Sequence, residues 1–331
     1  MIVFVLFVIG FVLLVYGANF LVDGAASFAK KKGLSNVVIG LTIVAMGTST
    51  PELVVNVIAS MAGADDVAMG NVLGSNIANI LLILGISSAI YPLVVKVNHK
   101  WKKIPFALEV PIAIAGAIII GILANEHLIF NTGRSEISRI NGLVLVAFFL
   151  GYLFYSFKYA NHGPDEEVEV KDMPVWRSIV LIPLGIGAMA LGGSWIVDGA
   201  VKIAEMFDMS EAIISLTIVA VGTSLPELAT SVAAAIKKNA GIAVGNIVGS
   251  NIFNVFFILG ISTIVNPIDF NPVMNFDILV ALFTTVILFV FLFLGRRNVL
   301  ERWQGVLLVI LYVFYVTALI FQETGAINMG F

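Results

Sequence analysis

The chain has 331 residues, of which 60% are hydrophobic and only 12% are charged, and its formal net charge is −3. This balance excludes an ordinary soluble domain and indicates a membrane protein. The lack of cysteine excludes disulfides and thiolate metal sites.

Ten apolar stretches have about the 20 residues that a membrane-spanning helix needs. The first has no basic segment before it, so we predict a spanning helix there and not a cleaved signal. The sequence thus predicts an all-α polytopic membrane protein. In chain order the expected spans are 2–28, 37–61, 67–90, 104–123, 138–157, 177–204, 212–236, 242–265, 275–295 and 303–321.

The basic residues favour one side of the membrane. When the loops are assigned to alternate sides, all of the 18 basic residues except Arg134, Arg139 and Lys202 fall on the same side. By the positive-inside rule that side is the cytoplasm, which predicts a multi-pass protein of the cell membrane with both termini outside. The bias also supports ten helices, because one missed helix would scramble the alternation.

The chain also repeats its own sequence, a feature that decides the architecture. GTSTPEL (47–53) returns as GTSLPEL, and GNVLGSNIANILLILGIS (70–87) returns as GNIVGSNIFNVFFILGIS, both 175 residues later; RING (139–142) resembles RWQG, 163 residues later. Each half holds five helices, an odd number, so the halves start on opposite sides. We therefore predict two inverted repeats, 1–157 and 177–331, joined by an acidic cytoplasmic linker, 158–176.

A carboxylate and a proline lie within one predicted span of each half. Glu52 and Glu227 would be costly there unless they had a function. Pro51 and Pro226 lack an amide hydrogen and disfavour helical backbone in the residue before them, which predicts a broken helix at each site. The carbonyls freed at each break would face an ion together with the hydroxyls of Thr48, Ser49, Thr223 and Ser224. Structural kinks are the alternative, and two copies of the motif favour the ion site.

The second repeated motif combines small residues with amides. Its glycines let helices approach closely. Its polar side chains are either ion ligands or hydrogen bonds between helices. They are Ser75, Asn76 and Asn79 in the first half and Ser250, Asn251 and Asn254 in the second.

Together these groups form a set of hard oxygen ligands without sulfur or imidazole, which suits Ca²⁺ or Na⁺. Two ionised carboxylates give the site a charge of −2, which one Ca²⁺, two Na⁺ or two protons neutralise. Moving the charged empty site through a dry barrier is expensive. A loaded site can cross and an empty site cannot, which predicts an antiporter and not an enzyme.

The motif pairs GTSTPE with GSNIAN and GTSLPE with GSNIFN resemble the two repeats of the sodium/calcium exchanger family, in the cation/Ca²⁺ antiporter superfamily. The resemblance covers nearly the whole chain. It implies that helices 2, 3, 7 and 8 line a midplane Ca²⁺ site, and that helices 1 and 6 slide past the rest. The chain differs from several prokaryotic members of the family at Asn254, where those members have Asp. The implied Ca²⁺ site uses Glu52, Glu227 and the backbone of Thr48 and Thr223; the implied Na⁺ sites use Ala45, Ser49 and Ser75 on one side and Ala220, Ser224 and Ser250 on the other, with Asn79 and Asn254 beside the centre.

Three other functions compete with Na⁺/Ca²⁺ exchange. An H⁺/Ca²⁺ antiporter could use the same two glutamates, but the GNAVE-like sequence of that family is absent. A cation channel with two acidic pore residues is less favoured, and an intramembrane enzyme least, since no nucleophile or histidine accompanies the acids. We expect Ca²⁺ and Na⁺ as transported ions, H⁺ as a competitor, the bilayer as surroundings, no cofactor, no nucleic acid, and one chain as the transport unit.

Overall fold

The computed structural model describes residues 2–32, 45–94, 105–126, 135–160, 171, 173–236, 238, 240–296 and 298–323. Most of the predicted acidic linker lies outside these residues, and so do residues 37–44 of the predicted second span.

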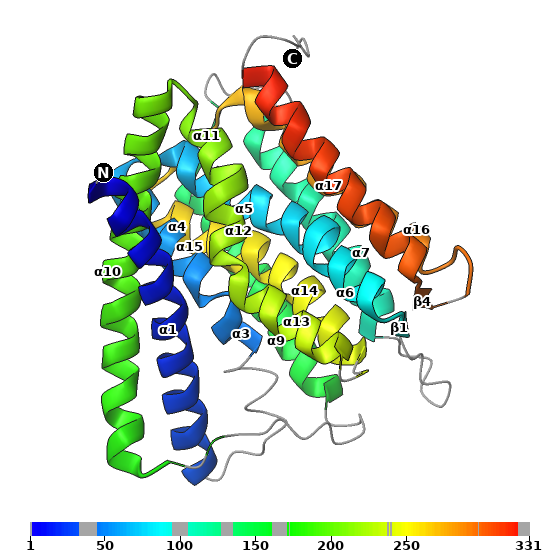
Figure 1. Ribbon diagram of the computed structural model, residues 1–331, viewed down its shortest axis with the longest axis horizontal. Helices are drawn as coiled ribbons and strands as arrows, with labels where there is room; N and C mark the ends of the chain where they lie inside the picture. The colour runs from blue at the N-terminus through cyan, green and yellow to red at the C-terminus, as the bar shows by residue number, and fades with distance from the viewer. Residues whose placement is uncertain are drawn as a thin grey trace.

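Helices make up nearly all of the described chain, as the hydropathy predicts (Figure 1). Three of the helical segments are π-turns, and one is a 3₁₀ turn. The helical elements are α1 (Ile2–Lys31), α3 (Ala45–Thr48), α4 (Thr50–Ala62), α5 (Asp65–Ala78), π-turn η2 (Asn79–Leu84), α6 (Gly85–Ile90), α7 (Pro105–Ala124), α9 (Arg139–Ala160), α10 (Val175–Phe207), α11 (Glu211–Ile214), π-turn η3 (Ser215–Val219), α12 (Ala220–Thr223), α13 (Leu225–Ile236), α14 (Ala240–Phe253), π-turn η4 (Asn254–Ile258), α15 (Leu259–Val265), 3₁₀ turn η5 (Pro272–Met274), α16 (Asn275–Phe291) and α17 (Arg302–Glu323).

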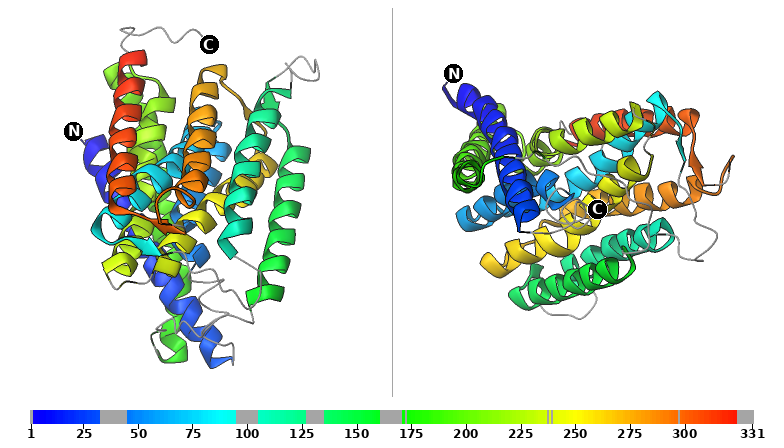
Figure 2. Two further views of the ribbon diagram at one scale, coloured as in Figure 1. Left: turned by 90° about the vertical axis from the view of Figure 1, so that its right-hand side faces the viewer. Right: turned by 90° about the horizontal axis from the view of Figure 1, so that it is seen from below.

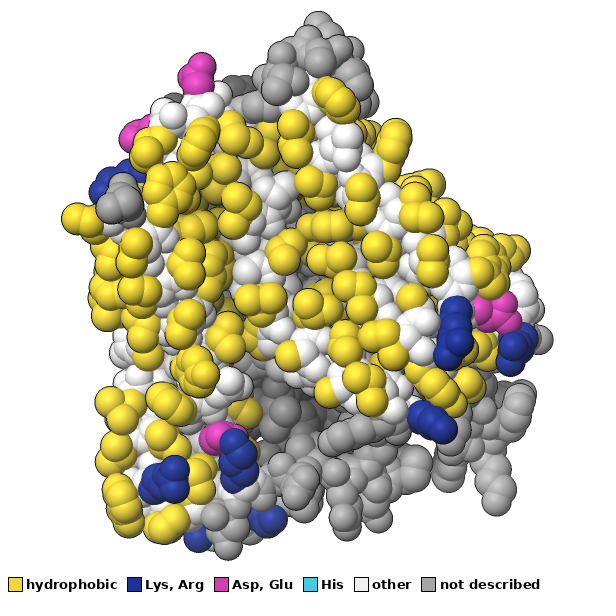
Figure 3. All heavy atoms as spheres, in the orientation of Figure 1, with side chains coloured by type: hydrophobic (Ala, Val, Ile, Leu, Met, Phe, Trp, Pro, Cys, Tyr) yellow, Lys and Arg dark blue, Asp and Glu magenta, His cyan; other side chains and the backbone are white. Residues whose placement is uncertain are grey.

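Hydropathy and length identify the membrane-spanning elements. Six described helices are long and apolar enough to span, and the bent pair Glu211–Thr223 with Leu225–Ile236 makes a seventh. Shorter apolar helices represent the predicted spans 37–61, 104–123 and 138–157, so the count of ten stays a prediction. Hydrophobic side chains cover most of the height of the face in Figure 3, and most of its Lys and Arg side chains lie in the lower half. This surface is that of a multi-pass membrane protein.

Helices α1 and α10 lie side by side along most of their length (Figures 1 and 2). They approach closely because glycines of each helix face the backbone of the other helix. A Cβ on Gly17 would lie 2.8 Å from the Gly185 carbonyl oxygen, and one on Gly10 would lie 2.8 Å from that of Gly192. Without a hydrophobic driving force in lipid, such close packing is what holds two helices together.

A side chain at this contact should separate the α1/α10 pair. We expect Gly17→Val to destabilise the protein by about 1–3 kcal/mol, since the added carbons overlap the opposite backbone. The matched control is Gly187→Val on α10, where a Cβ would meet no atom within 4 Å. Thermal unfolding in detergent measures the difference. Equal losses in both variants would show that the lost glycine, and not the helix contact, is responsible.

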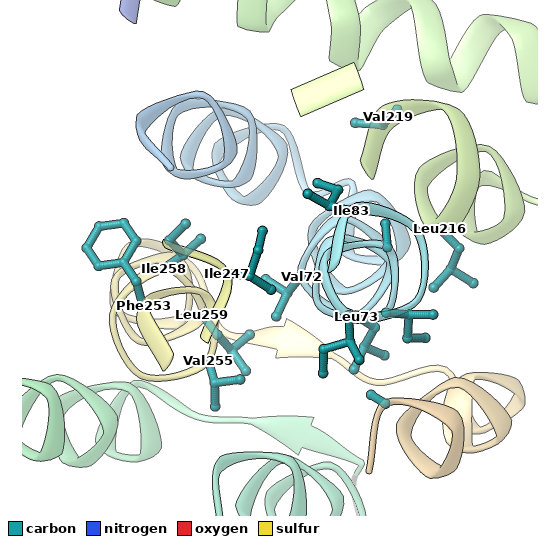
Figure 4. Close-up of a cluster of buried hydrophobic side chains, with 14 of the residues drawn as sticks. Val72, Leu73, Ile83, Leu216, Val219, Ile247, Phe253, Val255, Ile258 and Leu259 are labelled. Atoms are coloured by element: carbon teal, nitrogen blue, oxygen red, sulfur yellow. The ribbon is translucent and has the colours of Figure 1, made fainter. Parts of the chain in front are cut away.

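The rest of the protein packs around a buried core formed by segments from both halves. Figure 4 shows the side chains of α5 and η2 meeting those of η3 and of α14, η4 and α15. The structure also contains two pairs of two-residue strands, which the sequence did not predict. β1 (Leu93–Val94) pairs antiparallel with β4 (Val299–Leu300), and β2 (Glu136–Ile137) pairs with β3 (Ile268–Asp269). Each strand pair joins one sequence repeat to the other.

Candidate ion-binding site

The helix containing each glutamate is interrupted just before its proline, as predicted. In the first half α3 ends at Thr48, Ser49 has φ −89° and ψ 9°, and α4 begins at Thr50. In the second half Ser224 has φ −83° and ψ 9° between α12 and α13, and the two parts of the span are bent by 49°. Each proline is the second residue of its new helix, where its missing amide hydrogen costs nothing.

The two glutamates are buried and are held by hydroxyls from the opposite half. Ser224 Oγ donates a hydrogen bond to Glu52 Oε1 at 2.8 Å, and Ser49 Oγ donates one to Glu227 Oε1 at 2.7 Å. Glu52 is 2% exposed and Glu227 is 0% exposed. Both lie in the first turn of a helix, where the dipole favours a negative charge. The two interrupted helices therefore form one site.

Amide side chains from the second motif form a similar crossed set. Asn79 Nδ2 donates to Asn251 Oδ1 at 2.9 Å, and Asn254 Nδ2 donates to Asn76 Oδ1 at 3.0 Å. Asn79 and Asn254 are also the first residues of the π-turns η2 and η4. Such turns occur often at functional sites, and the residue pattern did not predict them.

Four oxygens at this site lie buried without a hydrogen-bond donor among the described residues. They are Oε2 of Glu52 and Glu227 and Oδ1 of Asn79 and Asn254, two pairs of repeat mates. A buried oxygen without a partner costs free energy, and a buried carboxylate costs more. These four atoms fit a cation as their missing partner. No three His, Cys, Asp or Glu side chains of the described chain form a metal-holding cluster, so neutral oxygens must complete any cation site here.

A third pair of asparagine repeat mates binds the backbone of the two helices that carry the glutamates. Asn71 Nδ2 lies 3.4 Å from the Glu52 carbonyl oxygen, and Thr223 Oγ1 donates to Asn71 Oδ1 at 3.1 Å. The repeat mates do the same: Asn246 Nδ2 lies 3.5 Å from the Glu227 carbonyl oxygen, and Thr48 Oγ1 lies 3.3 Å from Asn246 Oδ1. Sequence reasoning missed both asparagines, although each follows the first glycine of the second motif.

The structure groups the serines differently from the expected Na⁺ sites. Ser75 Oγ lies 3.5 Å from the carbonyl oxygen of Ala220, although Ser75 and Ala220 were expected in different Na⁺ sites. Ser250 Oγ lies 2.9 Å from Ser49 Oγ and 3.3 Å from Glu227 Oε1. This different grouping of the serines follows from helix packing, because α5 lies against η3 and α12 of the opposite half. Ala45 begins α3, and its side chain lies outside the described part of the chain.

Comparison with known proteins points to one family. The family model described as "Sodium/calcium exchanger protein" matches residues 2–158 and 177–321. The chain is 35% identical over 317 residues to the putative antiporter CaxA of Alkalimonas amylolytica, covering 93% of this chain and 95% of that protein. It is 31% identical to the sodium/calcium exchanger MaX1 of Methanosarcina acetivorans, covering 96% and 98% of the two chains. Among solved structures, the sodium-calcium exchanger NCX_Mj soaked with Na⁺ and Sr²⁺ matches with a TM-score of 0.64 and 32% identity, over 96% and 98% of the chains.

Proposed function

Because this chain belongs to the sodium/calcium exchanger family, we propose that it exchanges Ca²⁺ for Na⁺ across the cell membrane. One central site would open to each side in turn. The observation that carries the proposal is the set of four partnerless buried oxygens on Glu52, Glu227, Asn79 and Asn254. Ca²⁺ takes six to eight oxygen ligands, so it can accept all four and still bind backbone carbonyls and hydroxyls.

The charge of the site gives the reason for coupled exchange. Two ionised glutamates without a basic partner among the described residues must be neutralised before they can cross a dry barrier. One Ca²⁺ or two Na⁺ supply that neutralisation. The regrouped serines suggest where Na⁺ binds: Ser75 with Ala220 and Ser224 on one side of the centre, and Ser250 with Ser49 and Ala45 on the other.

The symmetry of these contacts supports the two-repeat architecture. Residues 175 apart make equivalent hydrogen bonds, as in Ser49 with Glu227 and Ser224 with Glu52. We assign residues 1–157 and 177–331 as two inverted repeats with ten spanning helices and both termini outside. In such carriers the site lies at the interface of the repeats, and one part of the fold moves relative to the rest.

Flux in sealed vesicles separates Na⁺ coupling from proton coupling. We expect purified protein in liposomes to take up ⁴⁵Ca²⁺ when Na⁺ is loaded inside, and to stop when Na⁺ is equal on both sides. A pH gradient imposed without Na⁺ should drive little uptake. Uptake that follows pH and ignores Na⁺ would instead identify an H⁺/Ca²⁺ antiporter using the same glutamates. Currents far above carrier turnover would identify a channel.

A further inference from the structure

An apolar groove runs along the outer surface of the protein between α6 and α17. It has a volume of about 370 Å³. We propose that this groove binds an acyl chain of an anionic phospholipid, whose phosphate lies between Arg302 and Lys238. The proposal does not depend on which ion is transported. The groove is lined by Ile86, Ala89, Ile90, Val306, Val309 and Ile310.

Comparison with the second repeat shows what opens the groove. Helix α9 packs on α15 in the same way as α17 packs on α6, with glycine at each contact. Ile264 of α15 fills the position next to Gly142, since a Cβ on that glycine would lie 3.0 Å from Ile264 Cγ1. The corresponding residue of α6, 175 positions earlier, is Ala89. Ala89 lacks the side-chain carbons that Ile264 places against α9, so it leaves more space between α6 and α17.

Positive charge is concentrated at one end of the groove. Arg302 Nη2 donates to the carbonyl oxygen of Ile90, a groove residue, at 3.2 Å. Lys238 Nζ lies 5.7 Å from the ring centroid of Tyr91, the next residue along the chain. Both cations are exposed, and neither forms an ion pair within the described residues, whereas Arg296 pairs with Glu301.

The chemistry of this end matches a phospholipid headgroup. An arginine fork binds a phosphate through two of its N–H groups, and a lysine adds a second positive charge. Trp303 is 47% exposed beside Arg302, as is common for tryptophan at the level of the headgroups. Basic clusters where helices leave the membrane on the cytoplasmic side attract anionic lipids. The groove can therefore bind both parts of the lipid: the acyl chain lies along α6 and α17, and the phosphate lies at the basic end of the groove.

A lipid bound here would contact α17, a helix that packs against part of the ion site. Helix α17 packs against η2 as well as α6, and η2 begins at Asn79. An acyl chain in the groove would hold α17 against these two elements. We therefore expect bound anionic lipid to raise the thermal stability of the protein.

Delipidated protein in detergent tests the proposal. Dioleoylphosphatidylglycerol should raise the melting temperature more than dioleoylphosphatidylcholine, and native mass spectrometry should detect bound phosphatidylglycerol. Arg302→Gln should weaken this binding about tenfold, the cost of one charge-assisted hydrogen bond. Ala89→Ile, which installs the side chain that the second repeat already has, should remove the difference between the two lipids.

Arg139→Gln is the matched control, because Arg139 is the repeat mate of Arg302 beside the filled contact of α9 and α15. It should leave the response to phosphatidylglycerol unchanged. Equal responses to the two lipids in wild type would overturn the proposal. So would an Ala89→Ile variant that binds phosphatidylglycerol as wild type does, or an Arg139→Gln variant that loses binding as Arg302→Gln does.

Discussion

Glu52→Gln and Glu227→Gln should each lower Na⁺-driven ⁴⁵Ca²⁺ uptake by at least roughly 30-fold, the effect of losing about 2 kcal/mol from a buried charged contact. Glutamine keeps the size of the side chain and an oxygen that can accept from Ser224 or Ser49. It removes the charge that would balance Ca²⁺. Because the two residues make equivalent contacts, we expect losses of similar size. Uptake in liposomes at saturating and at low Ca²⁺ separates weaker binding from slower turnover.

Asp277 offers a matched control for removing a buried carboxylate. It lies on α16, is 3% exposed, and accepts a hydrogen bond from Tyr315 Oη at 2.7 Å. It takes no part in the proposed ion site. Asp277→Asn should therefore retain Na⁺-driven uptake once the amount of folded protein is matched. Normal uptake by both glutamate variants would show that the ion binds elsewhere. An equal loss in Asp277→Asn at matched amounts of folded protein would show that the loss of uptake is not specific to the two glutamates.

The sequence predicted the local geometry of the site well because that geometry has local causes. Pro51 and Pro226 prevent a regular helix through the preceding turn, and the structure interrupts both helices there. Burial of Glu52 and Glu227 followed from their place in apolar segments. Each of these inferences needs only a few neighbouring residues.

Contacts between the halves could not be predicted in the same way. The repeat shows that Ser49 and Ser224 are equivalent, but not that each binds the glutamate of the other half. That pairing depends on how α5 packs against α12, which no local pattern encodes. The π-turns at Asn79 and Asn254 also escaped prediction, because every residue after the asparagine in each turn is apolar, so no shift between a polar and an apolar face marks the extra residue.

Differences between the equivalent contacts of α1 and α10 indicate how the carrier moves. Helix α10 packs along α4, where a Cβ on Gly193 would lie 3.0 Å from Val54 Cγ1 and 2.9 Å from Ile58 Cδ1. The repeat mates of Val54 and Ile58 are Ala229 and Ala233 on α13, and both are exposed. If the repeats exchange roles during transport, α1 must come to cover α13 as α10 leaves α4.

A disulfide between α10 and α4 should therefore stop exchange. We expect Val54→Cys with Gly193→Cys to cross-link on oxidation, because Val54 Cγ1 is one bond from Cβ and a disulfide needs a Cβ–Cβ distance of about 3.5–4.5 Å. The chain has no cysteine of its own, so no other thiol competes. Uptake after oxidation should equal that of the fraction of protein left uncross-linked, and a reductant should restore it. Each single variant should transport Ca²⁺ with or without oxidant.

The opposite arrangement can be trapped with the repeat mates of the same two residues. Ala18→Cys with Ala229→Cys places thiols on α1 and on the exposed face of α13. Because α13 is uncovered here, this pair should cross-link only as the protein passes through the other state, and faster when Na⁺ and Ca²⁺ let it cycle. Full cross-linking of Val54→Cys with Gly193→Cys and unchanged exchange would show that α10 stays on α4 throughout transport. In that case access to Glu52 and Glu227 would have to change by movement of the interrupted helices themselves.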